Sequence, residues 1–126
     1  MNRLPKIAMG AWAWGNDGAF GNDYTAEDLK AVYEAAMKNG LNLWDTAVVY
    51  GMGTSENILG ELTKDTPREE LLLSTKFTPQ IEDGTVQAMQ NMLDGSKERT
   101  DQGDWCFQPQ PCRNQAGRRD PWKGRS

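Results

Sequence analysis

Short strand-like segments and amphipathic stretches alternate along the first hundred residues of this chain. Each strand-like segment is short and rich in apolar residues, and each amphipathic stretch repeats its apolar residues at helical spacing. The pattern predicts strands at 6–9, 41–43 and 71–74, with helices beginning at Thr25, Ser55 and Thr85. Three strand–helix units in succession predict an α/β fold with a parallel sheet and right-handed crossovers.

The predicted helices have clear end signals. Thr25 is followed by acidic residues in the first helical turn, a typical N-cap arrangement, and Ser55 and Thr85 are the corresponding caps of the later helices. Gly40 suits the left-handed position that ends the first helix. Apolar positions of the first two helices are expected to face the sheet: Leu29, Val32, Tyr33, Ala36, Met37, Ile58, Leu59 and Leu62.

The chain changes character after Leu93. Residues 94–126 contain no Leu, Ile, Val or Met, so a strand built from them lacks the branched aliphatic side chains that fill a barrel core. Residues 104–126 are basic on balance, whereas the first 103 residues are acidic. We therefore divide the chain into a structured part, 1–100, and a tail, 101–126, that is expected to be largely disordered.

Charge and composition exclude several classes of partner. The net charge of −4 gives no reason to expect nucleic-acid or anionic-membrane binding. No apolar run approaches the roughly 20 residues that span a bilayer, and the amino end lacks a signal peptide's apolar core, so a cytoplasmic location is expected. Cys106 and Cys112 are too few for a disulfide framework and lack the further ligands of a zinc site, so no metal is expected.

Polar residues follow the strands at the positions where chemistry is expected. Asp45 comes at the end of the second strand, Tyr50 lies in the loop after it, and Lys76 ends the third strand. The carboxyl ends of parallel strands meet on one edge of a sheet or barrel, which is where such folds build their active sites. A lysine cation beside a phenol lowers the phenol's pKa and eases proton transfer near neutral pH, and a carboxylate orients the lysine.

Four motifs resemble the aldo-keto reductases. They are Met9 to Gly15, then Asp45-Thr46-Ala47 with Tyr50-Gly51, then Ser55-Glu56 with Leu59-Gly60, and finally Ser74-Thr75-Lys76. They occur in order and at suitable spacing from about Leu4 to about Thr100. The resemblance implies a (β/α)₈ TIM barrel and an NADP-dependent oxidoreductase that reduces aldehydes and ketones to alcohols.

The same resemblance implies roles for individual residues. Tyr50 matches the general acid, Lys76 its pKa-lowering partner, and Asp45 the carboxylate that anchors Lys76 and borders the cofactor. Gly10, Ala11 and Trp12 match the loop beside the nicotinamide of NADP. A small carbonyl compound is the implied substrate, and its identity is left open.

The chain also departs from the family pattern. A complete barrel of this kind has about 250 residues, whereas this chain has 126. We therefore expect a partial barrel of about three β-α units that does not close. The chain has no histidine to match the family's fourth catalytic residue, and the usual phosphate-binding loops lie beyond it. The expectation is a truncated reductase that is inactive. A residual enzyme with tyrosine-dependent NADPH oxidation is a further reading. The alternative is a non-catalytic half-barrel that acts by self-association through its exposed edges.

The tail could come from a shifted reading frame. Read one base later, degenerate codons for Gln102 to Gln115 permit a peptide similar to the family's sixth strand, including its Ser-Asn pair. A deletion that joined the third helix to that region out of register would produce this pattern. An unrelated low-complexity tail is the alternative, and the gene sequence distinguishes the two.

Overall fold

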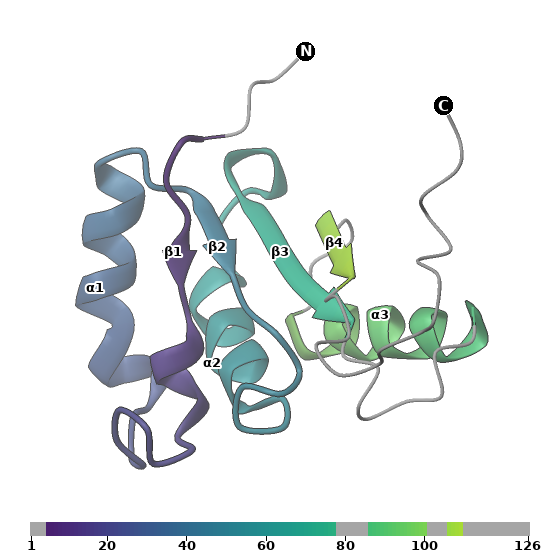
Figure 1. Ribbon diagram of the computed structural model, residues 1–126. Helices are drawn as coiled ribbons and strands as arrows, with labels where there is room; N and C mark the ends of the chain where they lie inside the picture. Colours follow the sequence, from purple (N-terminus) through teal and green to yellow (C-terminus); the bar gives the residue numbers. More distant parts are fainter. Residues whose placement is uncertain (1–4, 78–85, 101–105, 110–126) are drawn as a thin grey trace.

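The structure is a computed structural model that describes residues 5–77, 86–100 and 106–109. The described residues form a parallel sheet with helices between successive strands (Figure 1). In chain order, the elements are β1 (Met9–Gly10), the 3₁₀ helix η1 (Trp12–Gly15), α1 (Ala26–Lys38), β2 (Leu43–Asp45), α2 (Thr54–Thr63), the 3₁₀ helix η2 (Arg68–Glu70), β3 (Leu72–Phe77), α3 (Val86–Thr100) and β4 (Cys106–Pro109).

The sheet has the strand order β1-β2-β3-β4, and every pair of neighbours is parallel. Sequential order with helical crossovers is the arrangement of one side of a (β/α)₈ barrel. Among the described strands, β1 and β4 are the edges, so this sheet is open. The predicted partial, unclosed barrel of β-α units is confirmed.

The strand limits differ from the sequence prediction by a few residues. The first strand was predicted at 6–9 and is Met9–Gly10, because only these two residues pair with β2. The second begins at Leu43 instead of Leu41 and includes Asp45 as its last residue. The third is Leu72–Phe77, so Lys76 is the last residue but one of the strand and not its final residue.

Helix α1 begins at the predicted cap. The Thr25 side chain accepts a hydrogen bond from the Asp28 backbone N–H, and the Asp28 carboxylate accepts one from the Thr25 backbone N–H at 2.9 Å. This reciprocal capping box satisfies two backbone donors. The hydrogen bonds from Thr25 lower the pKa of Asp28. Gly40 adopts the predicted left-handed conformation with φ of +75°.

The core lies between the helices and one face of the sheet. Trp44 of β2 is fully buried and packs 5.1 Å from the Trp14 ring and 5.2 Å from the Tyr33 ring, measured between centroids. Figure 1 shows α2 behind β2 and β3, with α1 beside β1. Of the predicted apolar positions on α1, Val32 is the exception, since 48% of its surface is exposed.

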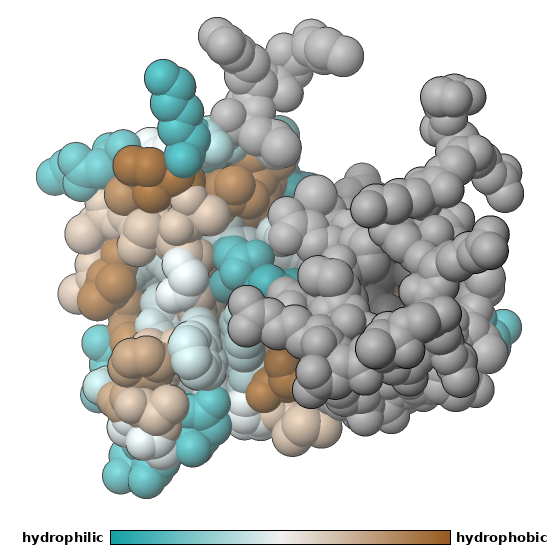
Figure 2. Space-filling model, in the orientation of Figure 1, coloured by the Kyte–Doolittle hydropathy of each residue, from teal (hydrophilic) through white to brown (hydrophobic). Residues whose placement is uncertain are grey.

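The opposite face of the sheet is turned toward the viewer in Figure 1, and no described helix covers it. Figure 2, in the same orientation, shows hydrophobic residues near the upper end of the described part of this face and paler residues over its middle. No described helix has the length and apolar character needed to cross a membrane.

The fourth strand was not expected from the sequence. Cys106–Pro109 pairs in parallel with Ser74 to Phe77 of β3, so these four tail residues are ordered as a strand despite their lack of branched aliphatics. Backbone pairing with β3 explains this, because ladder hydrogen bonds do not depend on side-chain type. The rest of the predicted tail at 101–105 and 110–126, and the predicted cap Thr85, lie outside the described residues.

Candidate active site

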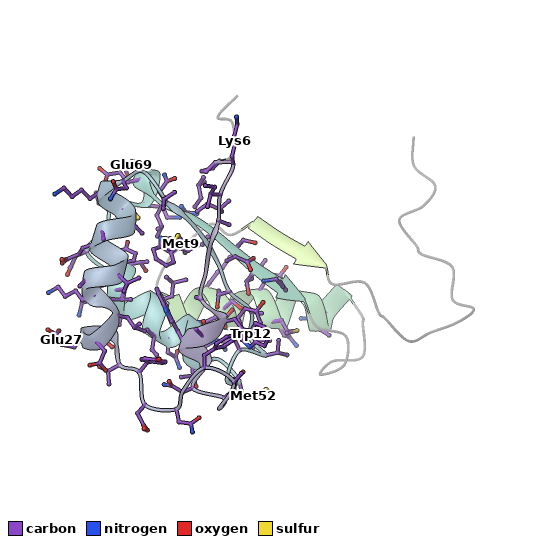
Figure 3. The ribbon with its side chains drawn as sticks, turned by 60° about the vertical axis from the view of Figure 1, so that its left-hand side comes forward. Lys6, Met9, Trp12, Glu27, Met52 and Glu69 are labelled. Atoms are coloured by element: carbon purple, nitrogen blue, oxygen red, sulfur yellow. The ribbon has the colours of Figure 1, made fainter. Side chains whose placement is uncertain are left out.

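The candidate site lies where the strands end. In Figure 3, Trp12 and Met52 are close together at one end of the molecule, and Lys6 and Glu69 are at the other. Trp12 follows β1 and Met52 follows β2, so the first end is the carboxyl end of the parallel strands. Parallel α/β folds build their binding sites at this end.

Asp45 and Lys76 meet across two neighbouring strands. Lys76 Nζ donates to Asp45 Oδ2 at 2.5 Å and to the carbonyl oxygen of Thr46 at 2.9 Å. The Lys76 side chain is 10% exposed and that of Asp45 is 28% exposed. The ammonium is therefore largely removed from water, and two oxygen acceptors from the end of β2 fix its position.

Tyr50 joins Asp45 and Lys76, as the sequence predicted, but it contacts Lys76 through its ring and not through its hydroxyl. Lys76 Nζ lies over the Tyr50 ring, 4.9 Å from the centroid, which is within cation–π range. Among the described residues, no hydrogen bond joins Nζ to the Tyr50 hydroxyl oxygen. The ammonium thus has its carboxylate and carbonyl partners in place, and the phenol hydroxyl is not one of them.

A tight backbone contact holds the Tyr50 loop against the loop after β1. A Cβ built on Gly51 would lie 1.7 Å from the carbonyl oxygen of Gly15, and one built on Gly15 would lie 2.7 Å from the carbonyl carbon of Tyr50. Gly51 also has a φ of +67°. Both glycines are required because any side chain would push the two loops apart.

Trp12 stacks its ring beside the Tyr50 ring. Its ring is 6.1 Å from the Tyr50 ring with an interplanar angle of 27°, and Phe20 packs edge-on to it at 5.2 Å. Trp12 Nε1 donates to Asp17 Oδ2 at 3.1 Å, which fixes the orientation of the indole. Trp12 is nevertheless 49% exposed, so an aromatic surface remains open beside Tyr50.

The three residues predicted to lie by a cofactor differ in accessibility. Gly10 is exposed, and a Cβ there would meet nothing within 4 Å, so there is open space beside it. Ala11 is fully buried, its N–H donates to the Asp45 carbonyl oxygen, and its own carbonyl accepts from Ser55. Gly10 and Trp12 can therefore contact a bound molecule directly, whereas Ala11 holds β1 to its neighbours.

Ser55 has a role that the sequence did not predict. It does not cap α2, whose N-cap is Gly53. Its buried hydroxyl donates to the Ala11 carbonyl oxygen at 2.6 Å and lies 2.9 Å from Thr46 Oγ1. These contacts join the start of α2 to the ends of β1 and β2. A local N-cap pattern carries no information about such distant partners.

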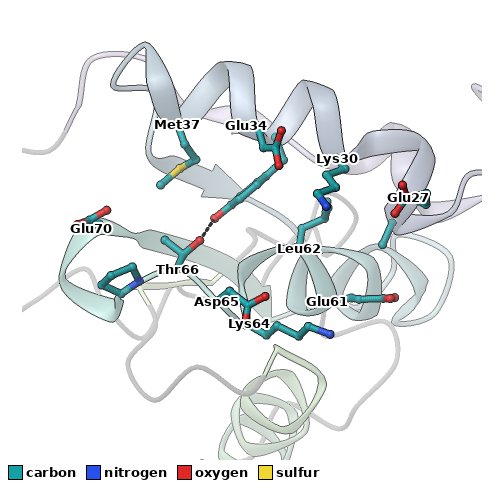
Figure 4. Close-up of a pocket in the computed structure, with 13 residues that line it drawn as sticks. Glu27, Lys30, Glu34, Met37, Glu61, Leu62, Lys64, Asp65, Thr66 and Glu70 are labelled. Carbon is teal, nitrogen blue, oxygen red and sulfur yellow. Dashed lines mark hydrogen bonds between the residues drawn. The ribbon is translucent and has the colours of Figure 1, made fainter.

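A separate cavity of about 560 Å³ lies between α1 and α2 (Figure 4). Tyr33 contributes to its wall, and its hydroxyl lies 2.7 Å from Thr66 Oγ1. Burial raises the pKa of Tyr33, the hydrogen bond with Thr66 lowers it, and the charge of Glu70 raises it further, with a net upward shift. This cavity is among the outer helices and contains none of Asp45, Tyr50 or Lys76.

Within the described part of the chain, no three His, Cys, Asp or Glu residues gather in a way that could hold a metal ion. The charged groups at the strand ends are one carboxylate and one ammonium, which neutralise each other. What the site offers a ligand is a phenol hydroxyl, an exposed indole and the open space beside Gly10.

The sequence is similar to those of known reductases. The sequence model described as the Aldo/keto reductase family matches residues 6–103. The chloroplastic pyridoxal reductase of Arabidopsis thaliana is 37% identical over 84 residues, which are 59% of this chain and 23% of that protein. The NADH-specific methylglyoxal reductase of Escherichia coli is 36% identical over 73 residues, or 58% of this chain and 22% of that protein.

The fold is also similar to those of solved aldo-keto reductase structures. A thermostable aldo-keto reductase in complex with the inhibitor epalrestat has a TM-score of 0.69 and 27% identity, covering 86% of this chain and 40% of that one. An aldo-keto reductase from Klebsiella pneumoniae in complex with NADPH has a TM-score of 0.64 and 25% identity, covering 79% of this chain and 32% of that one. The chain thus spans about a quarter of the curated relatives and about a third of the solved ones.

Proposed function

Since the chain belongs to the aldo/keto reductase family, we propose that it carries the proton-donating part of an NADPH-dependent carbonyl reductase. Its substrates would be aldehydes and ketones, which are reduced to alcohols. The observation that supports this most directly is the gathering of Asp45, Tyr50 and Lys76 at the carboxyl end of β2 and β3.

Each of the three residues has a distinct part in the proposed chemistry. As a carbonyl is reduced, negative charge develops on its oxygen, and the Tyr50 hydroxyl donates a proton to that oxygen. The Lys76 ammonium, near the ring, stabilises the phenolate that remains. Asp45 holds the ammonium in place through the 2.5 Å hydrogen bond and keeps the cluster electrically balanced.

The residues present fit a flat, polar heterocycle beside the phenol. Gly10 leaves open space at the end of β1, Trp12 offers an exposed aromatic edge, and Asp45 is partly exposed between them and Lys76. We propose that these residues border the nicotinamide of the cofactor. When bound, the cofactor supplies the hydride. NADPH is the cofactor proposed because a structural relative was solved with it. Another relative is named NADH-specific.

The absence of histidine lowers the expected rate. The chain contains no histidine to donate a second hydrogen bond to the substrate oxygen. Loss of one positioned donor typically slows catalysis by about 100-fold or more. We therefore propose slow turnover by this chain, with the tyrosine as the proton donor that remains.

Removal of a single hydroxyl tests the proposal. Tyr50→Phe keeps the ring that stacks on Trp12 and receives Lys76, and removes only the proton donor. NADPH oxidation with a reactive dicarbonyl should fall to the background rate in this variant. Tyr24→Phe is the matched control, because it also loses one hydroxyl, bonded to the Phe20 carbonyl outside the cluster, and should retain the rate. Equal rates for wild type and Tyr50→Phe would exclude Tyr50 as the donor.

Cofactor binding can be followed separately from turnover. NADPH added to the protein should quench the fluorescence of Trp12, which is exposed beside Tyr50, and Trp12→Phe should remove most of that quenching. The buried Trp44 serves as an internal reference, since it lies in the core. Quenching of the same size in Trp12→Phe would argue against a nicotinamide at this position.

A second candidate function follows from the open sheet. The strands β1 and β4 each have one edge that no described strand pairs. Exposed strand edges favour pairing with another chain. A non-catalytic half-barrel would then act by self-association, with a second copy covering the edges. Light scattering coupled to size-exclusion chromatography distinguishes the two: a stable dimer with no Tyr50-dependent NADPH oxidation supports this candidate, and a monomer removes it.

A further inference from the structure

A carboxylate with no contact to solvent lies beneath the proposed site. Glu56, in the first turn of α2, is 0% exposed. Its Oε1 accepts hydrogen bonds from the Thr75 hydroxyl at 2.8 Å and the Ser96 hydroxyl at 2.7 Å, and its Oε2 accepts one from Arg99 Nε at 2.5 Å. An ionised carboxylate is stable in such a position only when donors replace the water it has lost.

The three donors come from two different elements. Thr75 is on β3, and Ser96 and Arg99 are on α3. Glu56 therefore joins α2 to the strand on one side and to the next helix on the other. A single side chain fixes the relative positions of three elements that are far apart in the sequence.

The side chain of Arg99 runs past two glycines, Gly53 and Gly95, to reach Glu56. A Cβ on Gly53 would lie 3.0 Å from Arg99 Cδ, and one on Gly95 would lie 3.2 Å from Arg99 Nη1. Gly53 also has a left-handed φ of +94° at the N-cap of α2. The side chain of Arg99 thus passes through a narrow gap that larger residues would close, and it is only 26% exposed.

Thr75 connects this buried network to the proposed site. It directly precedes Lys76, and successive side chains of a strand point to opposite faces. Thr75 points toward Glu56 on the helix side of β3 and is 1% exposed, while Lys76 points to the side where Asp45 and Tyr50 lie. Any shift of Thr75 along or across the strand would carry the Lys76 backbone with it.

We propose that Glu56 is a positioning residue for Lys76. By holding the Thr75 hydroxyl, it fixes the carboxyl end of β3 so that the ammonium of Lys76 reaches Asp45 and lies over the ring of Tyr50. The inference rests on the proposed function for its catalytic meaning, but the position of Lys76 can be measured without any turnover.

Lys76 has a spectroscopic signature that reports its position. Protons held above an aromatic face are shifted upfield by the ring current, and Lys76 Nζ lies over the Tyr50 ring at 4.9 Å. In protein labelled with ¹³C-lysine, the ε-CH₂ signal of Lys76, assigned by its loss in Lys76→Arg, should lie upfield of those of the exposed lysines. Tyr50→Leu should abolish that shift and thereby identify its source.

The decisive variant is Thr75→Val, which keeps the shape of the side chain and removes the hydroxyl that Glu56 holds. The upfield shift of Lys76 should then be lost or strongly reduced. Thr75→Ser keeps the hydroxyl and should restore the shift. Ser96→Ala is the matched control: it removes a hydroxyl that donates to the same oxygen of Glu56, but from α3, and should lower stability while leaving the Lys76 signal in place.

An unchanged Lys76 signal in Thr75→Val would overturn the inference, and so would equal losses in Thr75→Val and Ser96→Ala. If Thr75→Val does not fold, Thr75→Cys takes its place, because a thiol is a weak donor; a partial loss of the shift supports the proposal and an unchanged shift overturns it.

The rate of dicarbonyl reduction is a second measurement, and it tests the proposed function as well as the position of Lys76. If the chain reduces dicarbonyls through Tyr50, Thr75→Val should lower kcat by about 10- to 100-fold, as small displacements of catalytic groups do, and should change KM little. Absence of any Tyr50-dependent rate in the wild type would contradict the proposed function. It would leave the result of the Lys76 measurement standing.

Discussion

The ammonium of Lys76 lies 2.5 Å from a carboxylate oxygen of Asp45, although 31 residues separate the two in the sequence. The parallel pairing of β2 with β3 brings them together, because Asp45 lies opposite Ser74, two residues before Lys76. The long side chain of Lys76 covers the remaining distance. The contact therefore depends on strand register, and a shift of one residue would turn Lys76 to the other face.

Asp45→Asn should lower the free energy of unfolding by about 1.5–3 kcal/mol, the range for a hydrogen bond to a charged group. The Lys76 side chain is 10% exposed, and without the carboxylate its buried ammonium would keep only neutral partners, such as the Thr46 carbonyl and the Tyr50 ring. Urea denaturation followed by tryptophan fluorescence measures the change. Asp23→Asn, at an exposed position, is the control and should have little effect. Equal effects of the two substitutions would contradict the contact.

Gly51→Ala should be far more destabilising than Gly40→Ala, although both glycines have positive φ. The left-handed conformation alone costs an L-residue about 1–2 kcal/mol, and a Cβ on Gly40 meets nothing within 4 Å. A Cβ on Gly51 would lie 1.7 Å from the Gly15 carbonyl oxygen, so overpacking adds roughly 1–3 kcal/mol more.

The same comparison has a spectroscopic readout. Gly51→Ala should change the near-UV circular dichroism, because it moves the Tyr50 loop away from Trp12. Gly40→Ala should leave that spectrum unchanged. If thermal unfolding shows the two variants equally stable, the close approach of the two loops is wrong.

Trp44→Ala should lower the free energy of unfolding by about 3–5 kcal/mol, the usual result of truncating a large buried aromatic residue. Trp44 is fully buried between Trp14 and Tyr33. Trp12→Ala removes the same side chain at a position that is 49% exposed, and should cost about 1 kcal/mol through lost ring contacts. Chemical denaturation of both variants tests the difference, and similar losses would place Trp44 outside the core.

Tyr33 should make stability fall in alkaline solution. Burial raises the pKa of Tyr33 in the folded protein, so the folded state keeps the phenol proton where the unfolded chain has begun to lose it. The stabilisation is complete below the unfolded pKa of about 10 and is lost as pH rises through the folded pKa. Melting temperatures measured between about pH 8 and pH 11 should fall more steeply for the wild type than for Tyr33→Phe.

The control for this pH dependence is Tyr24→Phe, which changes a more exposed tyrosine whose hydroxyl donates to Phe20. Its pH profile should follow the wild type. Parallel profiles for the wild type and Tyr33→Phe would show that burial of Tyr33 does not contribute to the alkaline loss.

The sequence by itself determined the order of the elements and which polar residues lie at the strand ends. Helical periodicity and end signals are local, so the Thr25 cap and the left-handed Gly40 could be predicted without knowing the fold. The grouping of Asp45 with Lys76 followed from one general rule, that parallel strands end on the same edge.

Tertiary structure decided which polar groups found partners and which surfaces stayed open. The hydroxyl of Ser55, predicted to be a helix cap, donates instead to the carbonyl of Ala11 just after β1. Glu56 accepts hydrogen bonds from β3 and α3. Ala11 became buried and Val32 exposed. The physical reason is that hydrogen bonding and burial depend on neighbours brought from distant parts of the chain, whereas periodicity and capping depend only on residues a few positions away.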